Sequence, residues 1–485
     1  MSKEAEMKEV ELNELEQEKQ SMSADTEKNG CVKVKVPEER EVKFTGLSKE
    51  ELMRVAGTTG WVRTRWILLV LFWLGWVGML AGAVVIIVQA PRCKPIPEMH
   101  WWNEGPLYQI SDVKEFSEDF KGVEDKLDSI NQLKVKGLIL GPIHSVQKDQ
   151  PSTLKLKDIN PEVGIEKALD SLLERAHKKG ISIVLDLTPN YEGSSAWFNN
   201  AAAFAEQFKD ACAHWIHKGI DGILVSHLDE IARVPAWSSI QAVVQTNTTE
   251  GTKKTALMGS VTGLALEEVS QLLNTSRVDL LITGLANLNQ SGVEQTKAVN
   301  KLYSNHAHTS LAWNLTTNNA PIRLYHTLLF TLPGTPVFNM GDEVGLKEGE
   351  DHNAIWDLEN SAEEKNETAK TLQEERSAVR NFFKTLSDLR GKERALLHGE
   401  YTPLYNSTSS IAFLRLWDQS ERFITVVNWG DAPITMALAH DDIPAEVRVR
   451  LSTDTEKLAV DSMVCVEKLE LGPKQAVLLS YPYAG

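Results

Sequence analysis

The stretch IEKALDSLLERAHKKGISIVLDL, residues 165–187, holds one helix and one strand, and this unit decides the fold. Its first part has apolar residues at helical spacing, and its end is a short apolar run typical of a buried strand. Seven similar runs occur, and amphipathic stretches of helical length separate most of them. With SIVLDL (182–187), the runs are LYQI (107–110), GLIL (137–140), GILVS (222–226), ALMGS (256–260), DLLIT (279–283), SLAW (310–313) and TPVF (335–338). Eight such units predict a closed (β/α)₈ barrel in an α/β protein. The alternative is an open doubly wound sheet, which usually has fewer strands and a glycine-rich first turn that this sequence lacks.

From about residue 400 the rhythm changes to short apolar runs joined by short turns, which predicts a small antiparallel β domain. The runs are SIAFLRLW, RFITVVNW, ITMALA, VRVRLS, SMVCVEKLEL and AVLLSYP. The N-terminal tail is rich in Glu and Lys, so we expect most of it to be disordered, apart from a helix that Ser48 and Glu51 would cap. The predicted segments are a tail (1–65), a membrane helix (66–88), a neck (89–105), the barrel (106–395) and the β domain (396–485).

The apolar run Trp66–Val88 contains no charge and no proline. As a helix it would be about 35 Å long, which is enough to cross a bilayer. A buried core helix is the alternative, but core helices rarely lack a polar face over this length. The run is too long, and too far from the N-terminus, for a cleaved signal peptide. Within it Gly75, Gly78 and Gly82 form a small-residue face that favours close packing against another membrane helix.

Glycosylation sequons indicate which side of the membrane the large C-terminal part occupies. None precedes the apolar run, and six follow it, at Asn247, Asn274, Asn289, Asn314, Asn366 and Asn406. The sequence therefore predicts a single-pass type II protein with a cytosolic N-terminus. Its formal net charge of −16 disfavours nucleic acid as a partner.

The four cysteines suggest a covalent link to another chain. Cys31 lies in the tail, where thiols stay reduced, and Cys212 and Cys465 lie in stretches that predict buried thiols. Cys93 follows the apolar run in APRCKP, where no core can bury it. An exposed cysteine in an oxidising compartment predicts an intermolecular disulfide. The alternative is a palmitoylated or unpaired thiol near the membrane.

Three motifs carry a resemblance to the α-amylase family of glycoside hydrolases. FTLPGTPVFNMGDEVGL (330–346) resembles that family's eighth-strand segment, LDLTPNY (185–191) its third-strand motif, and KLDSINQLKVKGLILGPI its second β/α unit. The resemblance extends from about Trp101 to the C-terminus. It implies a barrel followed by a β domain, without the long insertion that the family carries after strand three. We therefore expect neither the calcium nor the closed substrate cleft that this insertion helps to form, and no metal or cofactor.

The same resemblance predicts that the catalytic residues are missing. A retaining glycosidase needs two carboxyl groups about 5–5.5 Å apart, at the C-terminal ends of strands. The family's nucleophile position is Ser226, its orienting arginine is Leu224, and its acid position is Ser260. The third carboxylate falls in LAWNLTTNNAP, at Asn319, and this stretch has no acidic residue. We therefore expect no enzymatic activity.

An amylase-like domain on a type II anchor, with a cysteine next to the membrane, resembles the heavy chains of heteromeric amino-acid transporters. The lack of an insertion after strand three matches one of the two branches of that family. The resemblance implies a non-catalytic subunit at the plasma membrane, linked through Cys93 to a polytopic light chain that it stabilises and brings to the cell surface. It also implies an association with integrins, so an adhesion or signalling glycoprotein is the alternative. A membrane-anchored α-glycosidase is a further alternative, which the serines at positions 226 and 260 disfavour.

Overall fold

A computed structural model describes most of the chain beyond residue 45. The described residues are 46, 48–89, 93–199, 204–245, 254–284, 291–315, 321–347, 349–350, 352 and 367–484. They fall into two compact units, Met1–Arg92 and Cys93–Gly485.

The N-terminal unit consists of two helices, α2 (Lys49–Ala56) and α3 (Thr59–Gln89). The expected capping box is present at the start of α2. The Ser48 hydroxyl accepts a bond from the Glu51 amide at 3.3 Å, and the Glu51 carboxylate accepts one from the Ser48 amide at 3.2 Å. Helix α3 begins ahead of the apolar run, and with 31 residues it is about 46 Å long. In the described part of the chain, one helix is long and apolar enough to cross a membrane, and it is α3.

The second unit begins with the barrel, and the fold prediction is confirmed. Eight parallel strands pair in sequence order, and β8 closes the barrel against β1. Each strand begins and ends within one residue of its predicted run. The strands are β1 (Leu107–Ile110), β2 (Gly137–Leu140), β3 (Ser182–Asp186), β4 (Gly222–Ser226), β5 (Ala256–Val261), β6 (Leu280–Gly284), β7 (Leu311–Asn314) and β8 (Thr335–Asn339).

Amphipathic helices alternate with these strands, and their apolar residues pack with those of the strands and loops in the large hydrophobic core. They are α4 (Val113–Ser117), α5 (Phe120–Gln132), α6 (Glu166–Lys178), α7 (Ala205–His217), α8 (Leu228–Ile231), α9 (Trp237–Gln245), α10 (Leu266–Ser276), α11 (Gly292–Asn305), α12 (Ile322–Thr331), α13 (Glu367–Lys392) and α14 (Arg394–His398).

A separate apolar cluster fills the barrel itself. It contains inward-facing residues such as Val184, Leu224 and Met258, so the interior is packed and not open. Trp102 joins this cluster from the short 3₁₀ turn Trp101–Asn103. The segment predicted as the neck therefore ends in residues that pack into the barrel.

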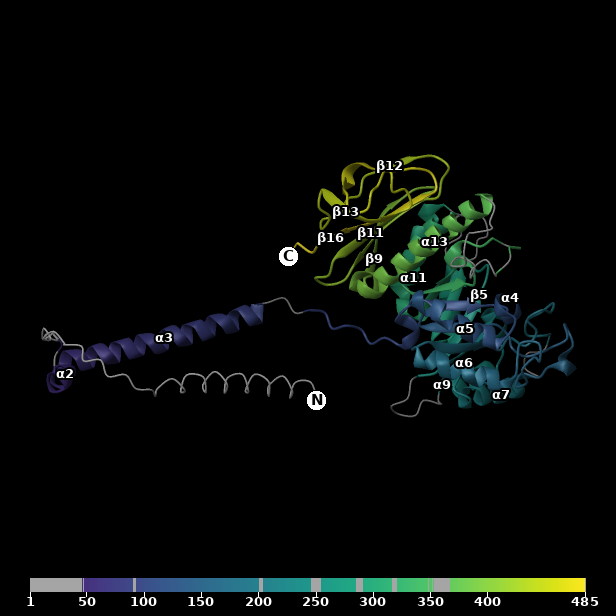
Figure 1. Ribbon diagram of the computed structural model, residues 1–485, viewed down its shortest axis with the longest axis horizontal. Helices are drawn as coiled ribbons and strands as arrows, with labels where there is room; N and C mark the ends of the chain where they lie inside the picture. Colours follow the sequence, from purple (N-terminus) through teal and green to yellow (C-terminus); the bar gives the residue numbers. More distant parts are fainter. Residues whose placement is uncertain are drawn as a thin grey trace, which may run out of the picture. The chain divides into compact units, whose positions relative to one another are not determined.

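The β domain contains a six-stranded antiparallel sheet in the order β14-β13-β16-β11-β10-β9 and a two-stranded sheet of β12 and β15 (Figure 1). Two details differ from the predicted strands. Strand β9 was not predicted, and SMVCVEKLEL is two strands, because the 3₁₀ turn Val466–Lys468 divides it. The strands are β9 (Glu400–Asn406), β10 (Ser410–Leu416), β11 (Arg422–Asn428), β12 (Ile434–Met436), β13 (Glu446–Ser452), β14 (Met463–Cys465), β15 (Leu469–Leu471) and β16 (Gln475–Tyr481).

Two buried arginines hold this part of the molecule together: Arg415 joins the β domain to the barrel, and Arg390 joins α13 to α12. Arg415 of β10 is fully buried and donates hydrogen bonds to the carbonyls of Thr331, Leu396 and Gly399, which lie on or next to α12 and α14. Arg390 of α13 donates similarly to carbonyls at the end of α12 and in the turn that follows it. Burial lowers the pKa of Arg415 to about 9. Because the site excludes water, leaving either the guanidinium or its carbonyl partners without hydrogen bonds would cost free energy of folding.

Candidate functional site

The C-terminal ends of the barrel strands surround a cavity of about 300 Å³, at the position where barrel enzymes carry their active sites. Its lining includes Ser226, Ser260, Gln109, Asn314 and Asn339. Among the described residues that line the cavity there is no carboxylate. The mouth of this barrel therefore presents hydroxyl and amide groups and the imidazole of His227.

Ser226 and Ser260 lie side by side because β4 and β5 pair in a register that places them opposite each other. The Ser260 hydroxyl donates to the Ser226 hydroxyl at 3.1 Å, and the Ser226 hydroxyl donates to Asp186 at 2.8 Å. The structure thus brings together two of the three positions that we expect, from the resemblance, to correspond to catalytic residues. Asn319, the third, lies outside the described residues.

Asp186, at the end of β3, is the carboxylate below these serines, and it is 7% exposed. One of its oxygens accepts a hydrogen bond from the Ser226 hydroxyl. The other oxygen accepts two hydrogen bonds from Thr188, one from the backbone N–H at 2.9 Å and one from the hydroxyl. Burial raises the pKa of Asp186, and the bonds from Thr188 and Ser226 oppose that rise. Leu224 lies opposite Asp186 on the neighbouring strand β4, and its side chain packs in the apolar interior of the barrel. It therefore offers Asp186 no positive charge.

The other side of the mouth is an amide network that the sequence analysis missed. The Asn314 amide nitrogen donates to Gln109 and to Asn339, at 3.3 Å each, and Asn339 donates back to Asn314 at 3.0 Å. All three residues lie at or near the C-terminal ends of β1, β7 and β8, and this placement could have marked them. A network of neutral amides has no group that could act as a nucleophile or as a general acid at neutral pH.

Two carboxylates, Asp342 and Glu343, follow β8, and both are engaged in hydrogen bonds that stabilise this part of the chain. The Asp342 carboxylate accepts a hydrogen bond from the backbone N–H of Asn339 at 2.7 Å. Glu343 accepts the Tyr108 hydroxyl at 3.0 Å and the Gly341 amide at 2.9 Å. Among the described residues, no group of three or more His, Cys, Asp or Glu side chains could hold a metal ion.

Cys93 is an exposed free thiol, and the next residue attaches it to the β domain. The Lys94 amide donates to Asp418 at 3.2 Å, and the Lys94 ammonium pairs with Glu400 at 3.0 Å. The same ammonium lies 5.8 Å from the ring centre of Trp417. These contacts hold Cys93 at one edge of the domain while its sulfur stays accessible.

The other two cysteines of this unit differ from each other. Cys212 of α7 is buried, as predicted, and burial raises the pKa of its thiol. The prediction that Cys465 is buried was wrong, because this thiol is exposed. Its strand, β14, lies at the edge of the sheet, and the exposed Met463 and Cys465 alternate with the half-buried Val464, so Cys465 lies on the solvent-facing side of the strand. Cys465 is therefore a second accessible thiol in the part of this unit that the structure describes.

Three of the six sequon asparagines lie in the described part of the chain. Asn274 on α10 and Asn406 at the end of β9 are exposed. Asn314 is half-buried, and its amide nitrogen is already engaged in the barrel mouth, which makes it a poor acceptor for a glycan. Asn247, Asn289 and Asn366 lie outside the described residues.

The three glycines of α3 leave a shallow strip along the helix. Gly75, Gly78 and Gly82 are three and four residues apart, so they share one face, and no atom lies within 4 Å of the position of an added side chain. The whole helix is exposed within its own unit. The strip is therefore open for contact with another helix.

Family comparisons agree with this organisation. Residues 32–108 match the family described as solute carrier family 3 member 2 N-terminus, and residues 107–210 match the alpha amylase catalytic domain. The amino acid transporter heavy chain SLC3A2 of Oryctolagus cuniculus is 42% identical, over 99% of both chains. The heavy chain SLC3A1 of Rattus norvegicus is 23% identical, over 95% of this chain and 90% of its own.

Solved structures share the fold of the barrel and β domain. An alpha-amylase from Geobacillus thermoleovorans, in complex with acarbose, has a TM-score of 0.57 and 17% identity, over 80% of this chain and all of its own. A debranching enzyme from Nostoc punctiforme has a TM-score of 0.59 and 17% identity, over 79% of this chain. Identity at this level reflects a shared fold. With its full-length similarity to SLC3A2, and with one described helix long and apolar enough to cross a membrane, this chain belongs to the family of amino acid transporter heavy chains.

Proposed function

We propose that this chain is the non-catalytic subunit of a heterodimeric amino-acid transporter. A disulfide at Cys93 would join it to a polytopic light chain, which the heavy chain stabilises and brings to the plasma membrane. The observation that carries the proposal is an accessible thiol, held at the edge of the β domain, in a chain that belongs to the heavy-chain family. A single helix without an intramembrane charge cannot by itself form a path for a polar substrate.

The geometry of the barrel mouth supports a non-catalytic role. Glycosidic cleavage needs one carboxylate as nucleophile and a second carboxyl group as acid, at a defined separation. Here hydroxyls occupy both positions and bond to each other at 3.1 Å. Asp186 is buried, and its two oxygens accept bonds from Thr188 and Ser226, so it is not available to attack a sugar.

The sequons and the charges flanking α3 support a type II orientation. All six sequons follow α3, and Arg63 and Arg65 lie in its first turns, ahead of the apolar run. Two of the sequon asparagines, Asn274 and Asn406, are exposed on the second unit. We therefore place the second unit outside the cell and the tail in the cytosol.

Two contacts would hold the light chain. The glycine strip of α3 would pack against a light-chain helix, since small residues allow close approach in the membrane. The disulfide would act on chains that already share a membrane, mainly by raising their effective concentration. Cys93→Ser should therefore abolish the covalent dimer and leave some light chain at the surface. Complete loss of surface light chain would contradict the packing contribution.

The test is electrophoresis of membranes from cells that make this chain together with a light chain, with thiols alkylated during lysis and with or without reductant. We expect a band larger by the mass of a light chain, lost on reduction and absent in Cys93→Ser. Cys465→Ser is the matched control, because it removes the other exposed thiol of the described part of this unit, and it should keep the large band. A wild-type chain that runs as a monomer in both conditions would refute the covalent link.

A further inference from the structure

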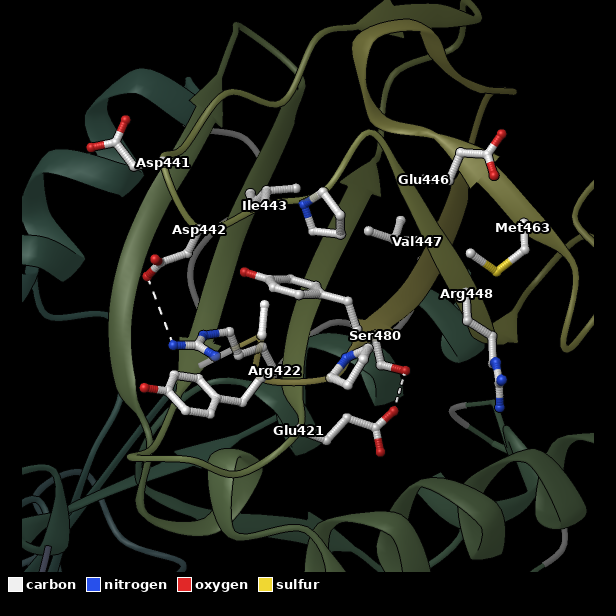
Figure 2. A pocket seen from close by; sticks show the side chains of 15 residues that line it. Glu421, Arg422, Asp441, Asp442, Ile443, Glu446, Val447, Arg448, Met463 and Ser480 are labelled. Carbon is white, nitrogen blue, oxygen red and sulfur yellow. Dashed lines mark hydrogen bonds and ion pairs between the residues drawn. The ribbon is translucent and has the colours of Figure 1, made fainter. Parts of the chain in front are cut away.

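The β domain contains a cavity of about 780 Å³, remote from the barrel mouth in sequence and built from different strands (Figure 2). Residues of β11, β13, β14 and β16 line it, together with the loop that precedes β13. Figure 2 shows Arg422 and Asp442 facing each other on one side, and Val447, Arg448 and Met463 on the other. None of the residues that line this cavity lines the barrel mouth.

Arg422 lies at one end of the cavity and is short of hydrogen-bond acceptors. The residue is 7% exposed, and its Nε is buried without a partner among the described residues. Its closest acidic contact is Asp442, at 3.8 Å from Nη2, which is an ion pair but too long for a hydrogen bond. The ring of Tyr483 covers the guanidinium at 4.7 Å. A buried guanidinium in this state is costly unless an acceptor completes its bonds.

Tyr481 supplies a second unpaired donor to the same cavity. Its side chain is 3% exposed, and its hydroxyl is buried with no partner in the described structure. Burial raises the pKa of Tyr481 to about 12, so the phenol keeps its proton and can donate it to an acceptor. Arg422 and Tyr481 lie opposite each other where β11 pairs with β16, so one acceptor could serve both. A carboxylate has the two oxygens that such an arrangement requires.

The remaining lining carries four carboxylates and one further cation, and part of it is apolar; the charged residues are Glu421, Asp441, Asp442, Glu446 and Arg448. Asp441 and Asp442 are exposed at the rim, and Ile443, Val447 and Met463 contribute hydrocarbon. Two carboxylates next to the guanidinium disfavour a phosphate or any other ligand that carries only negative charge. They favour a ligand with an ammonium group close to its carboxylate.

We propose that this cavity binds a zwitterionic α-amino acid with an apolar side chain. Its carboxylate would bond to Arg422 and Tyr481, its ammonium would pair with Asp442, and its side chain would contact Ile443 and Pro444. The cavity is larger than one amino acid, so water fills the space that the ligand leaves. The inference goes beyond the proposed function, because the site is on the heavy chain itself and does not depend on the Cys93 link.

The test is equilibrium binding of leucine to the full-length chain, produced without a light chain and purified in detergent. Two analogues separate the parts of the ligand, since 4-methylpentanoate lacks the ammonium and 3-methylbutylamine lacks the carboxylate. We expect saturable leucine binding and at least tenfold weaker binding of each analogue. The absence of saturable leucine binding up to about 10 mM would overturn the proposal.

Variants locate the site. Asp442→Asn changes an exposed rim residue and should weaken leucine binding at least tenfold, without affecting folding. Arg422→Lys keeps the charge but loses the planar set of donors, and it should have an effect at least as large. Asp431→Asn is the matched control, because Asp431 is an exposed carboxylate of the same domain outside the cavity lining, and it should bind as the wild type does. Leucine binding that Asp442→Asn and Arg422→Lys both leave unchanged would overturn the proposal, as would equal affinity for 4-methylpentanoate.

Discussion

Replacing Ser226 by Asp tests the geometry of the barrel mouth directly. The Ser226 hydroxyl lies 2.8 Å from a carboxylate oxygen of Asp186, so an Asp in its place would bring two carboxylates into contact. Two like charges about 4 Å apart repel by about 4 kcal/mol at an effective dielectric constant of 20. Leu224, at the family's arginine position, supplies no positive charge to offset this repulsion. We therefore expect Ser226→Asp to lower the free energy of unfolding by about 3 kcal/mol at pH 7.5.

The pH dependence of this loss follows from its cause. Repulsion raises the pKa of the carboxyl pair in the folded state, so the folded protein binds a proton that the unfolded chain does not bind at the same pH. The penalty is complete above the raised pKa and diminishes as the pH falls toward about 4, where the unfolded carboxyls also take up protons. Stability should therefore recover on acidification.

Urea unfolding of the full-length chain in detergent, followed by tryptophan fluorescence at pH 7.5 and pH 5, would measure both effects. Ser226→Asn is the matched control, because its amide keeps a donor for Asp186 and adds no charge. We expect Ser226→Asn to stay close to the wild type at both pH values. Equal stability of the Asp and Asn variants at pH 7.5 would refute the contact between position 226 and Asp186.

The same position allows a test of activity. Ser226→Asp combined with Ser260→Glu restores both carboxylates of a retaining glycosidase. We expect no hydrolysis of maltose, because Leu224 still lacks the charge of the family's arginine and the strand-three insertion is absent. Measurable release of glucose would show that the barrel mouth retains more of an active site than we infer.

Three further predictions concern stability and modification. His144 is fully buried, and burial lowers its pKa to about 4. Below about pH 6.5 the unfolded chain therefore binds a proton that the folded protein does not, which destabilises the wild type. His144→Phe lacks this proton uptake, so its free energy of unfolding relative to the wild type, measured with urea, should be about 2 kcal/mol more favourable at pH 5 than at pH 7.5. Arg415→Met should lower the free energy of unfolding by about 3–5 kcal/mol, because it leaves buried carbonyls unpaired at the junction of the barrel and the β domain. An unchanged midpoint of urea unfolding would contradict this prediction. Asn406→Gln should remove one glycan and increase electrophoretic mobility, whereas Asn314→Gln should not, because the Asn314 amide is engaged in the barrel mouth.

Local patterns predicted most of the fold. Each barrel strand is a short, mostly apolar run, and amphipathic stretches of helical length separate most of these runs, so their order alone indicated a (β/α)₈ barrel. Strand β9 was missed because its residues are half-buried or exposed and show no apolar run. The 3₁₀ turn inside SMVCVEKLEL was missed because a continuous stretch of strand-forming residues carries no signal for a turn.

The candidate sites depended more on the tertiary structure. The residue types at positions 226 and 260 could be read from the sequence, but their contact with Asp186 depends on the registers of β3, β4 and β5. Cys93 could be recognised as exposed because it follows a membrane helix. The exposure of Cys465 could not be predicted, because it depends on which face of the edge strand β14 is turned to solvent.

The sequence by itself determined the membrane helix, the barrel, the β domain and the absence of acidic residues at positions 226 and 260, because composition and periodicity act over neighbouring residues. Only the tertiary structure decided which distant side chains meet. The pairing of β11 with β16 places Arg422 opposite Tyr481, and the barrel brings Gln109 next to Asn314 and Asn339. These contacts arise from strand register and barrel closure, which join residues far apart in the chain and leave no periodic trace in the sequence.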